Sequence, residues 1–435
     1  MKKINPWAWV STLYFAEGLP YVVVTTLSLV MYKQLNLSNA EITFYTSWLN
    51  LPWLIKPLWS PFVDILKTKR WWILSMQILI GAALAGVAFT IPTGFWFQST
   101  FALFFLIAFS SATHDIAADG FYMLGLNQHE QAYFVGIRST FYRLATIFGQ
   151  GVLVMIVGDL QVYFRNSIRL SWSLVFYGIT GLFIALWLYH RYILPLPKED
   201  RPHMQVEASQ IWEDFVHTLV TFFQKPQVCA GICFMLFYRM PEGLLAKVST
   251  LFLLDAGHNG GLGLAPQDLG LVQGTVGVVG LTLGGILGGL AVSCNGLKKW
   301  LWPMVCAITL PDAVYIYLSY ALLDLSSIFN YVIVNICVFV EQFGYGFGFT
   351  AYMLYLIYYS RGKYKTSHYA LCTALMTASL MLPGLVAGWL QEQVGYRMFF
   401  IIVLACCSVT FLVSSFLKID PSFGKKNVDN PAANE

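Results

Sequence analysis

Charged residues are scarce in this sequence. Only 11% of the 435 residues are Asp, Glu, Lys or Arg, and 57% are hydrophobic, whereas a soluble domain carries about 25% charged residues. This scarcity excludes a soluble globular domain and indicates an integral membrane protein. Apolar runs of about 20 residues, the length that crosses roughly 30 Å of hydrocarbon, recur twelve times. We expect them near 7–32, 42–64, 72–92, 99–125, 133–158, 172–194, 228–254, 268–294, 301–323, 328–359, 368–390 and 398–418.

Several sequence motifs are also missing. There is no Gly-rich phosphate loop and no Walker motif, which argues against ATP-driven transport. None of the eight cysteines has the spacing of a metal ligand, so we expect them to pack within helices. No cofactor and no nucleic-acid partner are predicted. The opening residues MKKINPWAWV lack a small-residue cleavage site, so the first run is expected to remain as an uncleaved span.

Lys and Arg are distributed unevenly between the two sides of the predicted membrane. If the N-terminus is cytoplasmic, the cytoplasmic segments contain seventeen of these residues and the outer loops contain four, namely Lys33, Arg165, Arg169 and Arg397. Positive residues concentrate on the cytoplasmic side of membrane proteins. Both termini are therefore expected in the cytoplasm.

The longest polar insert divides the chain into two sets of six runs. We expect an N-terminal six-helix bundle at 1–194, a linker at 195–227, a C-terminal bundle at 228–418 and a tail at 419–435. Within the linker, one face of a predicted amphipathic helix lies along the cytoplasmic surface. This face consists of Ile211, Phe215, Leu219 and Phe222. The alternative is a solvated linker that does not contact the membrane.

The two halves resemble each other in sequence. EGLPYVVVT at 17–25 matches EGLLAKVST at 242–250, LNLSNAEI matches LGLAPQDL at 262–269, and YML recurs at 122–124 and 352–354. The three offsets are 225, 227 and 230 residues. In LNLSNAEI, the Ser and Glu have the spacing of a capping box, which predicts the start of the second helix. Two parallel repeats resemble the plan of the major facilitator fold, an all-α membrane fold of twelve helices with a central site between two pseudo-symmetric bundles. In that fold, helices 1, 4, 7 and 10 line the central cavity.

Charged residues inside the predicted spans are nearly balanced between six acids and five bases. They are Glu17, Lys56, Asp115, Asp119, Arg138, Arg143, Arg239, Glu242, Lys247, Asp312 and Glu341. Charges at this depth are costly unless opposite charges compensate them. The balance therefore predicts ion pairs.

Residues at equal distance from the turn between the fourth and fifth helices lie at equal depth, which predicts partners for two aspartates. Both Asp115 and Arg143 lie fourteen residues from the turn at His129, or roughly 21 Å along each helix. Asp119 and Arg138 lie ten and nine residues from it. We therefore expect the pairs Asp115–Arg143 and Asp119–Arg138.

The same counting about the turn at Leu37 pairs Glu17 with Lys56. Two interpretations of HDIAADG, the segment that contains Asp115 and Asp119, remain open. Fixed ion pairs could join the fourth helix to the fifth. Alternatively, one carboxylate releases its cation and takes up a proton in each transport cycle, since burial favours the neutral acid.

The seventh helix contains Arg239, Glu242 and Lys247, with Pro241 to interrupt it. A broken helix in a membrane span often lies beside a substrate. Lys247 has no acid on the eighth helix to pair with, so we expect it to bind an anionic group of the substrate. The alternative is an ordinary kink with an internal Arg239–Glu242 pair.

The repeat places GYGFGFT, at 344–350, opposite HDIAADG, so that Tyr345 corresponds to Asp115. Aromatic faces stack on sugar rings, and we expect Tyr345 to contact substrate near Glu341. The glycines are equally suited to close helix packing. Asp312, beside Pro311, is expected to be structural.

Four segments carry a resemblance to a known family. They are LPWLIKPLWSPFVD at 51–64, ATHDIAADGF at 112–121, TSHYALCTAL at 366–375 and PGLVAGWLQEQVGYRMFF at 383–400. They are similar to the peptide/acetyl-CoA transporter branch of the major facilitator superfamily, which includes the AmpG-type muropeptide permeases. His114 and His368 stand where that family has glutamine, and Phe121 and Tyr122 stand where the permeases often have Tyr-Arg.

The resemblance implies a proton-coupled symporter of the bacterial inner membrane that imports a muropeptide, an amino sugar or a short peptide during peptidoglycan recycling. We expect a monomer, powered by the proton gradient and without enzymatic activity. The coupling and gating set is Asp115, Asp119, Glu17, Lys56, Arg138, Arg143 and Asp64; the last resembles the acidic element of the superfamily's loop between helices 2 and 3. The substrate set is Arg239, Glu242, Lys247, Glu341 and Tyr345.

Two other functions stay open. One is a facilitator or antiporter of acylated or phosphorylated metabolites such as acetyl-CoA, because ADGF resembles the VDGW of acetyl-CoA transporters. The other is a membrane-embedded transferase, which would place catalytic acids in an interfacial loop. The acids of this sequence lie at mid-depth within the spans, which disfavours the transferase.

Overall fold

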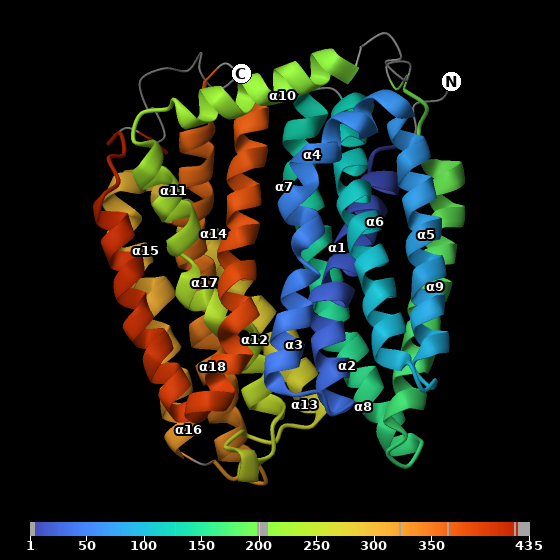
Figure 1. Cartoon of the computed structure of the whole chain (residues 1–435), viewed down its shortest axis with the longest axis vertical. Coiled ribbons are helices and arrows are strands. Elements are labelled where there is room, and N and C mark those ends of the chain that lie inside the picture. Colours follow the sequence, from blue (N-terminus) through green and yellow to red (C-terminus); the bar gives the residue numbers. More distant parts are fainter. Residues whose placement is uncertain are drawn as a thin grey trace.

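The protein is helical throughout the part that the computed structural model describes, which covers residues 5–126, 128–197, 200, 208–321, 323–362, 365–421 and 423–424. The first half of the chain forms one group of helices (Figure 1). Its elements are α1 (Trp7–Val22), η1 (Val23–Leu27), α2 (Ser28–Gln34), α3 (Asn39–Trp48), α4 (Leu51–Leu66), α5 (Lys69–Thr90), α6 (Trp96–Gly125), α7 (Gln128–Thr146), η2 (Ile147–Leu153), α8 (Val154–Tyr163) and α9 (Ile168–Ile193).

The second half forms a group beside the first, and a linker helix lies across one end of both (Figure 1). The linker helix is α10 (Ala208–Phe223). The second half consists of α11 (Val228–Phe237), α12 (Met240–Leu254), η3 (Gly257–Asn259), α13 (Pro266–Leu271), η4 (Val272–Gly277), α14 (Val278–Asn295), α15 (Leu297–Thr309), η5 (Leu310–Asp312), α16 (Ala313–Ala321), α17 (Ile328–Ser360) and α18 (Lys365–Ser415).

These elements make twelve membrane crossings, as the sequence predicts. Ten apolar helical stretches in the described part of the chain are long enough to span a bilayer. One of them, α18, contains two crossings that meet at Gly395, where φ is +74° and the chain turns back. The short helices α3 and α4 are separated by Leu49 and Asn50 and together form one further crossing.

The start of α3 follows its local sequence. The Ser38 hydroxyl accepts a hydrogen bond from the backbone N–H of Glu41 at 3.2 Å, and the Glu41 carboxylate accepts one from the N–H of Ser38 at 3.1 Å. These bonds satisfy two helix-end donors. The predicted capping box is confirmed.

The apolar core shows how the two halves meet. At the end opposite the termini, one continuous cluster joins side chains of both halves, including Val30 and Ile42 of the first half and Leu251 and Phe400 of the second. Toward the end where α10 lies, the core separates into a cluster confined to the first half and a cluster of the second half with the linker's Phe222. The halves therefore pack together at one end and part at the other.

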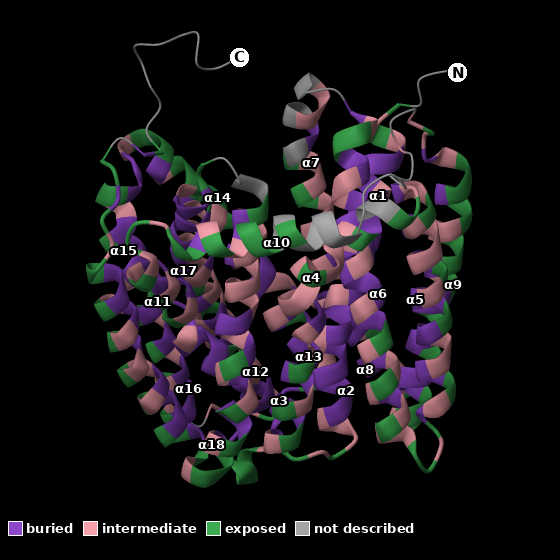
Figure 2. Ribbon diagram, turned by 45° about the horizontal axis from the view of Figure 1, so that its top comes forward, coloured by how far each residue is buried: buried purple, intermediate pink, exposed green. Residues whose placement is uncertain are grey.

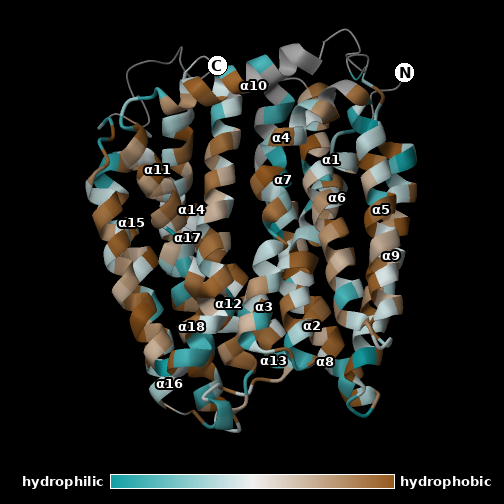
Figure 3. Ribbon diagram, in the orientation of Figure 1, coloured by the Kyte–Doolittle hydropathy of each residue, from teal (hydrophilic) through white to brown (hydrophobic). Residues whose placement is uncertain are grey.

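The outer surface of the bundle is apolar, as a bilayer requires. Large hydrophobic side chains on several helices remain exposed, among them Phe89, Ile286, Leu290 and Ile336. Figure 2 shows the mixture of exposed and buried positions along the helices, and Figure 3 shows hydrophobic residues along their length. Exposed apolar surface of this extent is typical of lipid contact.

The linker helix packs on the second half through its last turn. Phe222 is buried and Leu219 is half-buried, and the Phe222 ring lies 5.6 Å from the ring of His368 at the start of α18. The side chains of Ile211 and Phe215, which complete the predicted apolar face, lie outside the described residues.

Candidate functional site

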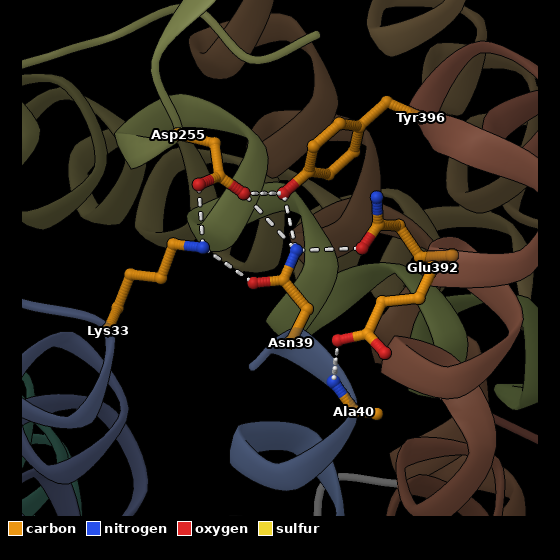
Figure 4. A network of polar contacts seen from close by, with 7 residues as sticks. Lys33, Asn39, Ala40, Asp255, Glu392 and Tyr396 are labelled. Carbon is orange, nitrogen blue, oxygen red and sulfur yellow. Dashed lines mark hydrogen bonds and ion pairs between the residues drawn. The ribbon is translucent and has the colours of Figure 1, made fainter. Parts of the chain in front are cut away.

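A polar network closes the space between the halves at the end opposite the termini (Figure 4). Lys33 Nζ lies 2.6 Å from Asp255 Oδ1 and donates to Asn39 Oδ1 at 2.7 Å. The Asn39 amide donates to Gln391 Oε1 at 2.7 Å and to the Tyr396 hydroxyl at 2.9 Å, and Tyr396 donates to Asp255. Because Lys33 and Asn39 belong to the first half and the other three to the second, these bonds hold the two halves together.

Helices α3 and α18 continue this closure. The backbone N–H of Ala40 donates to Glu392 at 2.8 Å, and the N–H of Gly388 donates to the Thr43 hydroxyl at 2.9 Å. A Cβ atom on Gly388 would stand 2.1 Å from the carbonyl oxygen of Asn39. Only glycine therefore permits the helices to approach this closely.

Lys247 also bridges the halves. Its ammonium group donates to the hydroxyls of Thr46 and Ser47 on α3 at 2.9 and 2.8 Å. Among the described residues, no carboxylate lies within ion-pair distance of this group. The sequence did not predict that two hydroxyls of the other half would receive it.

A charged array lies inside the first half. Lys56 Nζ lies 2.6 Å from Asp115 Oδ2, and Arg138 Nη2 lies 2.9 Å from Asp119 Oδ1. The Tyr14 hydroxyl donates to Asp119 at 3.0 Å, and its ring lies 4.5 Å beneath the Arg138 guanidinium. The predicted Asp119–Arg138 pair is confirmed.

The other two predicted pairs are wrong. Lys56 pairs with Asp115 and not with Glu17, and Arg143 donates to the Thr282 hydroxyl of the second half at 3.0 Å. Counting residues from a turn gives the depth of a side chain but not its direction around the helix. Helix α4 packs against α6, which directs Lys56 toward Asp115.

Glu17 instead contacts an acid. Glu17 is 6% exposed, and its carboxyl group lies close to that of Asp115. A hydrogen bond between two carboxyl groups requires one of them to carry a proton. The second Glu17 oxygen, Oε2, has no hydrogen-bond partner among the described residues.

Solvent reaches this array although it lies well inside the spans. The exposed fractions of the side chains are 29% for Lys56, 20% for Asp115, 30% for Arg138 and 41% for Asp119. The apolar cores of the two halves are separate toward this end of the bundle. The array is therefore part-exposed and lies where the two halves have separate apolar cores.

Arg239 and Tyr345, two predicted substrate residues, meet in the second half. The Arg239 guanidinium donates to the Tyr345 hydroxyl and lies 4.5 Å from the ring of Phe349 and 5.7 Å from that of Tyr352. Arg239 is 4% exposed, so these aromatic faces replace much of its hydration. Among the described residues, the internal pair between Arg239 and Glu242 does not form.

The remaining predicted substrate acids lie together with a third acid. One carboxylate oxygen from each of Glu242, Asp312 and Glu341 lies within 4.8 Å of the others. Asp312 was expected to be only a structural neighbour of Pro311. The sequence gives no indication that η5, which follows α15, brings Asp312 beside Glu341 of α17.

The two histidines that replace glutamine have polar partners. His114 and His190 both contact the amide of Gln77, at 3.0 and 2.9 Å, and His190 contacts the Thr12 hydroxyl at 3.0 Å. This buried chain links the helices of the first half. His368 contacts Thr221 of the linker at 3.2 Å. The side chain of Asp64 lies outside the described residues.

Sequence reasoning missed the closing network. Asn39 lies in the repeated loop motif LNLSNAEI, whose Ser and Glu predict a helix start but give no indication of a contact for Asn39. Asp255 and Tyr396 follow the ends of helical segments and lie outside the predicted mid-membrane charges. Repetition of the loop in the second half was the one available indication that these two ends of the bundle meet.

Comparisons with known proteins agree with this architecture. The family model described as Major Facilitator Superfamily matches residues 10–363. The anhydromuropeptide permease of Escherichia coli K12 is 26% identical over 399 residues, which cover 90% of this chain and 76% of the relative. The putative transporter AmpG 4 of Rickettsia conorii is 22% identical over 425 residues, which cover 94% and 96%. The crystal structure of the nucleoside transporter NupG aligns with a TM-score of 0.69 at 15% identity, over 94% of this chain and 98% of that one.

Proposed function

The chain belongs to the Major Facilitator Superfamily, and we propose that this secondary transporter is a proton-coupled symporter that imports a cell-wall-derived amino sugar, muropeptide or short peptide. The proposal separates into a coupling site in the first half and a substrate surface in the second. The array around Asp115 performs the coupling, and the aromatic surface around Arg239 receives the substrate.

The contact between Glu17 and Asp115 is the observation that carries the coupling proposal. In this proposal the two carboxyl groups share a proton, while Lys56, 2.6 Å from Asp115, compensates the remaining negative charge. Loss of that proton would leave two carboxylates facing one ammonium group at low dielectric, which is unfavourable. Proton release therefore changes the balance of charge between α1, α4 and α6, and the transporter can couple this change to a rearrangement of its halves.

The second pair of the array holds the helices in place. Asp119 bonds to Arg138 of α7 and to Tyr14 of α1 at the same time. Because its Oδ1 atom meets both a hydroxyl donor and a guanidinium group from neighbouring helices, we assign Asp119 a gating role and Asp115 the proton. Arg143, which contacts Thr282 across the halves, is assigned to the movement of the halves.

The substrate surface consists of aromatic rings with a cation behind them. Tyr345 and Phe349 stack on each other at 5.7 Å and are half-buried. Aromatic faces suit the apolar side of a sugar ring, and Arg239 behind them favours an anionic group. Lys247 supplies a second cation near the closed end. Similarity to a protein named anhydromuropeptide permease supports a substrate with both features.

The distribution of Lys and Arg sets the proposed direction of transport. If both termini are cytoplasmic, the closed network of Lys33 and Asp255 faces the outside and the array around Asp115 communicates with the cytoplasm. The structure then corresponds to the state that releases substrate inward. Asp64 is proposed to help close the inner side in the opposite state.

Uptake into proteoliposomes tests the proposal. Radiolabelled anhydro-muropeptide, N-acetylglucosamine and acetyl-CoA are supplied outside, with and without an acidic outer pH, and a protonophore serves as the control. We expect anhydro-muropeptide or the amino sugar to accumulate only under the pH gradient. Uptake that reaches equilibrium but ignores the gradient would indicate a facilitator, and exchange of acetyl-CoA would support the antiporter instead.

A further inference from the structure

Three acids of the second half form a cluster that the coupling proposal does not use. Glu242, Asp312 and Glu341 come from α12, η5 and α17, and they are 7%, 4% and 2% exposed. One carboxylate oxygen of each lies within 4.8 Å of the other two. Acids are almost never buried to this extent without a partner, and charged groups inside a bilayer are expensive.

Hydrogen-bond donors around the cluster reach only some of its carboxylate oxygens. Glu341 accepts from the Gln342 amide at 3.0 Å and from the Tyr315 hydroxyl at 3.4 Å, and Asp312 accepts from the Cys407 thiol at 3.6 Å. Glu242 Oε2 has no hydrogen-bond partner among the described residues. An acceptor thus remains unsatisfied in a group that is more than nine-tenths buried and faces two other acids.

The basic side chains of the seventh predicted span form their hydrogen bonds with other groups and not with the three acids. The nearest cation along the chain is Arg239, whose guanidinium donates to Tyr345 and lies over the rings of Phe349 and Tyr352. Lys247 donates to hydroxyls of α3. Within the described residues, no Lys or Arg forms an ion pair with any of the three acids.

Two interrupted helices meet at this cluster. Glu242 lies in the first turn of α12, directly after the break at Arg239 that separates it from α11. Asp312 lies in the single turn η5 that separates α15 from α16. The third helix, α17, packs closely against α15 at Gly344. A Cβ atom at this position would stand 2.2 Å from the carbonyl oxygen of Ala307, so glycine permits the close approach. Interrupted helices at mid-membrane free backbone oxygens, and transporters use such places to bind ions.

We infer that Glu242, Asp312 and Glu341 form a binding site for a hard metal cation with the radius of calcium or sodium. Oxygen ligands suit such cations, and three ligands held at 2.3–2.6 Å from one ion, at angles of about 90–120°, lie roughly 3.3–4.5 Å apart. The three carboxylate oxygens all lie within 4.8 Å of one another, which is compatible with this spacing. A bound cation also supplies the positive charge that the three acids lack.

This site goes beyond the proposed proton symport and does not depend on it. The coupling pair Glu17 and Asp115 lies in the first half, whereas the cation site lies entirely in the second. A cation there joins α12, η5 and α17, so its binding stabilises the packing of the second half whatever the transported substrate is.

Direct binding to the purified full chain tests the inference in the absence of substrate. The probes are ⁴⁵Ca²⁺ and ²²Na⁺ in separate equilibrium-dialysis experiments, in a buffer of constant ionic strength made up with choline chloride. We expect saturable binding of one of the two, weaker at acidic pH because protons compete for the carboxylates. The ion that does not bind saturably should compete only weakly when it is added to the ion that does. If neither ion binds saturably to the unmodified chain, the inference is wrong.

Variants locate the site. Glu242→Gln and Glu341→Gln remove one ligand each, and we expect either to weaken binding more than about tenfold. Asp324→Asn changes an exposed acid of the same half and should leave binding unchanged. Melting curves without added ions verify that the variants fold. Unchanged affinity in both folded ligand variants would place the bound ion elsewhere and overturn the assignment. Failure of proton-driven uptake, by contrast, would not affect this result.

Discussion

Lys56 of α4 forms an ion pair of 2.6 Å with Asp115 of α6, and Asp115 in turn contacts the carboxyl group of Glu17 on α1. Three helices of the first half therefore meet at one ammonium group. This arrangement makes Lys56 the counter-charge of a pair of acids, so its removal should affect both stability and coupling.

The first prediction concerns the stability of that pair. Lys56→Met leaves the part-buried Asp115 carboxylate without its counter-charge and should destabilise the protein by about 1–3 kcal/mol. The double variant Lys56→Met with Asp115→Asn should recover most of the loss, because no unpaired charge remains. Thermal unfolding of the four proteins in detergent forms a double-mutant cycle. If the losses of the single variants simply add, the two residues are not coupled.

The second prediction concerns proton coupling. Asp115→Asn and Glu17→Gln each remove the carboxyl pair that shares a proton, so both variants should exchange labelled substrate in counterflow yet fail to accumulate it under a pH gradient. Both activities are measured in the same proteoliposomes.

Asp119→Asn is the matched control for this experiment. It removes the partner of Arg138 and Tyr14 and should lower the folded yield and slow uptake, while accumulation by the folded fraction still depends on the pH gradient. Accumulation by Asp115→Asn at the unmodified level would move the proton to another acid.

The third prediction concerns the closed end. Asp255→Asn removes the charge that pairs with Lys33 and should destabilise the closed state. The ratio of closed to open molecules should fall about tenfold for each ~1.4 kcal/mol of closure free energy that is lost. Ala387 is fully buried beneath the network. In a background without native cysteines, Ala387→Cys should react faster when Asp255 is replaced, with an impermeant maleimide added on the side of the membrane that Lys33 and Asp255 face. Asp324→Asn, on an exposed loop, should leave the reaction rate unchanged. Equal rates in the two variants would show that the network does not gate access.

The fourth prediction concerns helix contact at Gly388. Gly388→Ala places a Cβ atom 2.1 Å from a backbone oxygen of α3, and a backbone atom cannot rotate away as a side chain can. We expect the end opposite the termini to close poorly and uptake to fall, by about tenfold for each ~1.4 kcal/mol of closure free energy lost.

Gly289→Ala provides the comparison, because nothing lies within 4 Å of its Cβ position on α14. This change should keep uptake and add about 0.5–1 kcal/mol of stability through helix propensity. Normal uptake by Gly388→Ala would mean that α3 and α18 need not approach closely during transport.

Much of the fold could be predicted because its determinants are local. Hydrophobic length predicts the twelve crossings, the spacing of Ser38 and Glu41 predicts the start of α3, and equal distance from a turn predicts the pair Asp119–Arg138. Each of these depends on residues that are near one another in the chain or on adjacent antiparallel helices.

The sequence by itself determined a membrane protein of two similar halves with charges placed at mid-depth. Tertiary structure alone decided that Lys56 meets Asp115, that Glu17 meets an acid, that Asp312 joins Glu242 and Glu341, and that Asn39 closes one end of the bundle. The physical reason is that hydrophobic length and residue spacing fix how deep a side chain lies. The rotation of each helix about its axis, and the points where helices break, depend on packing between segments far apart in the chain.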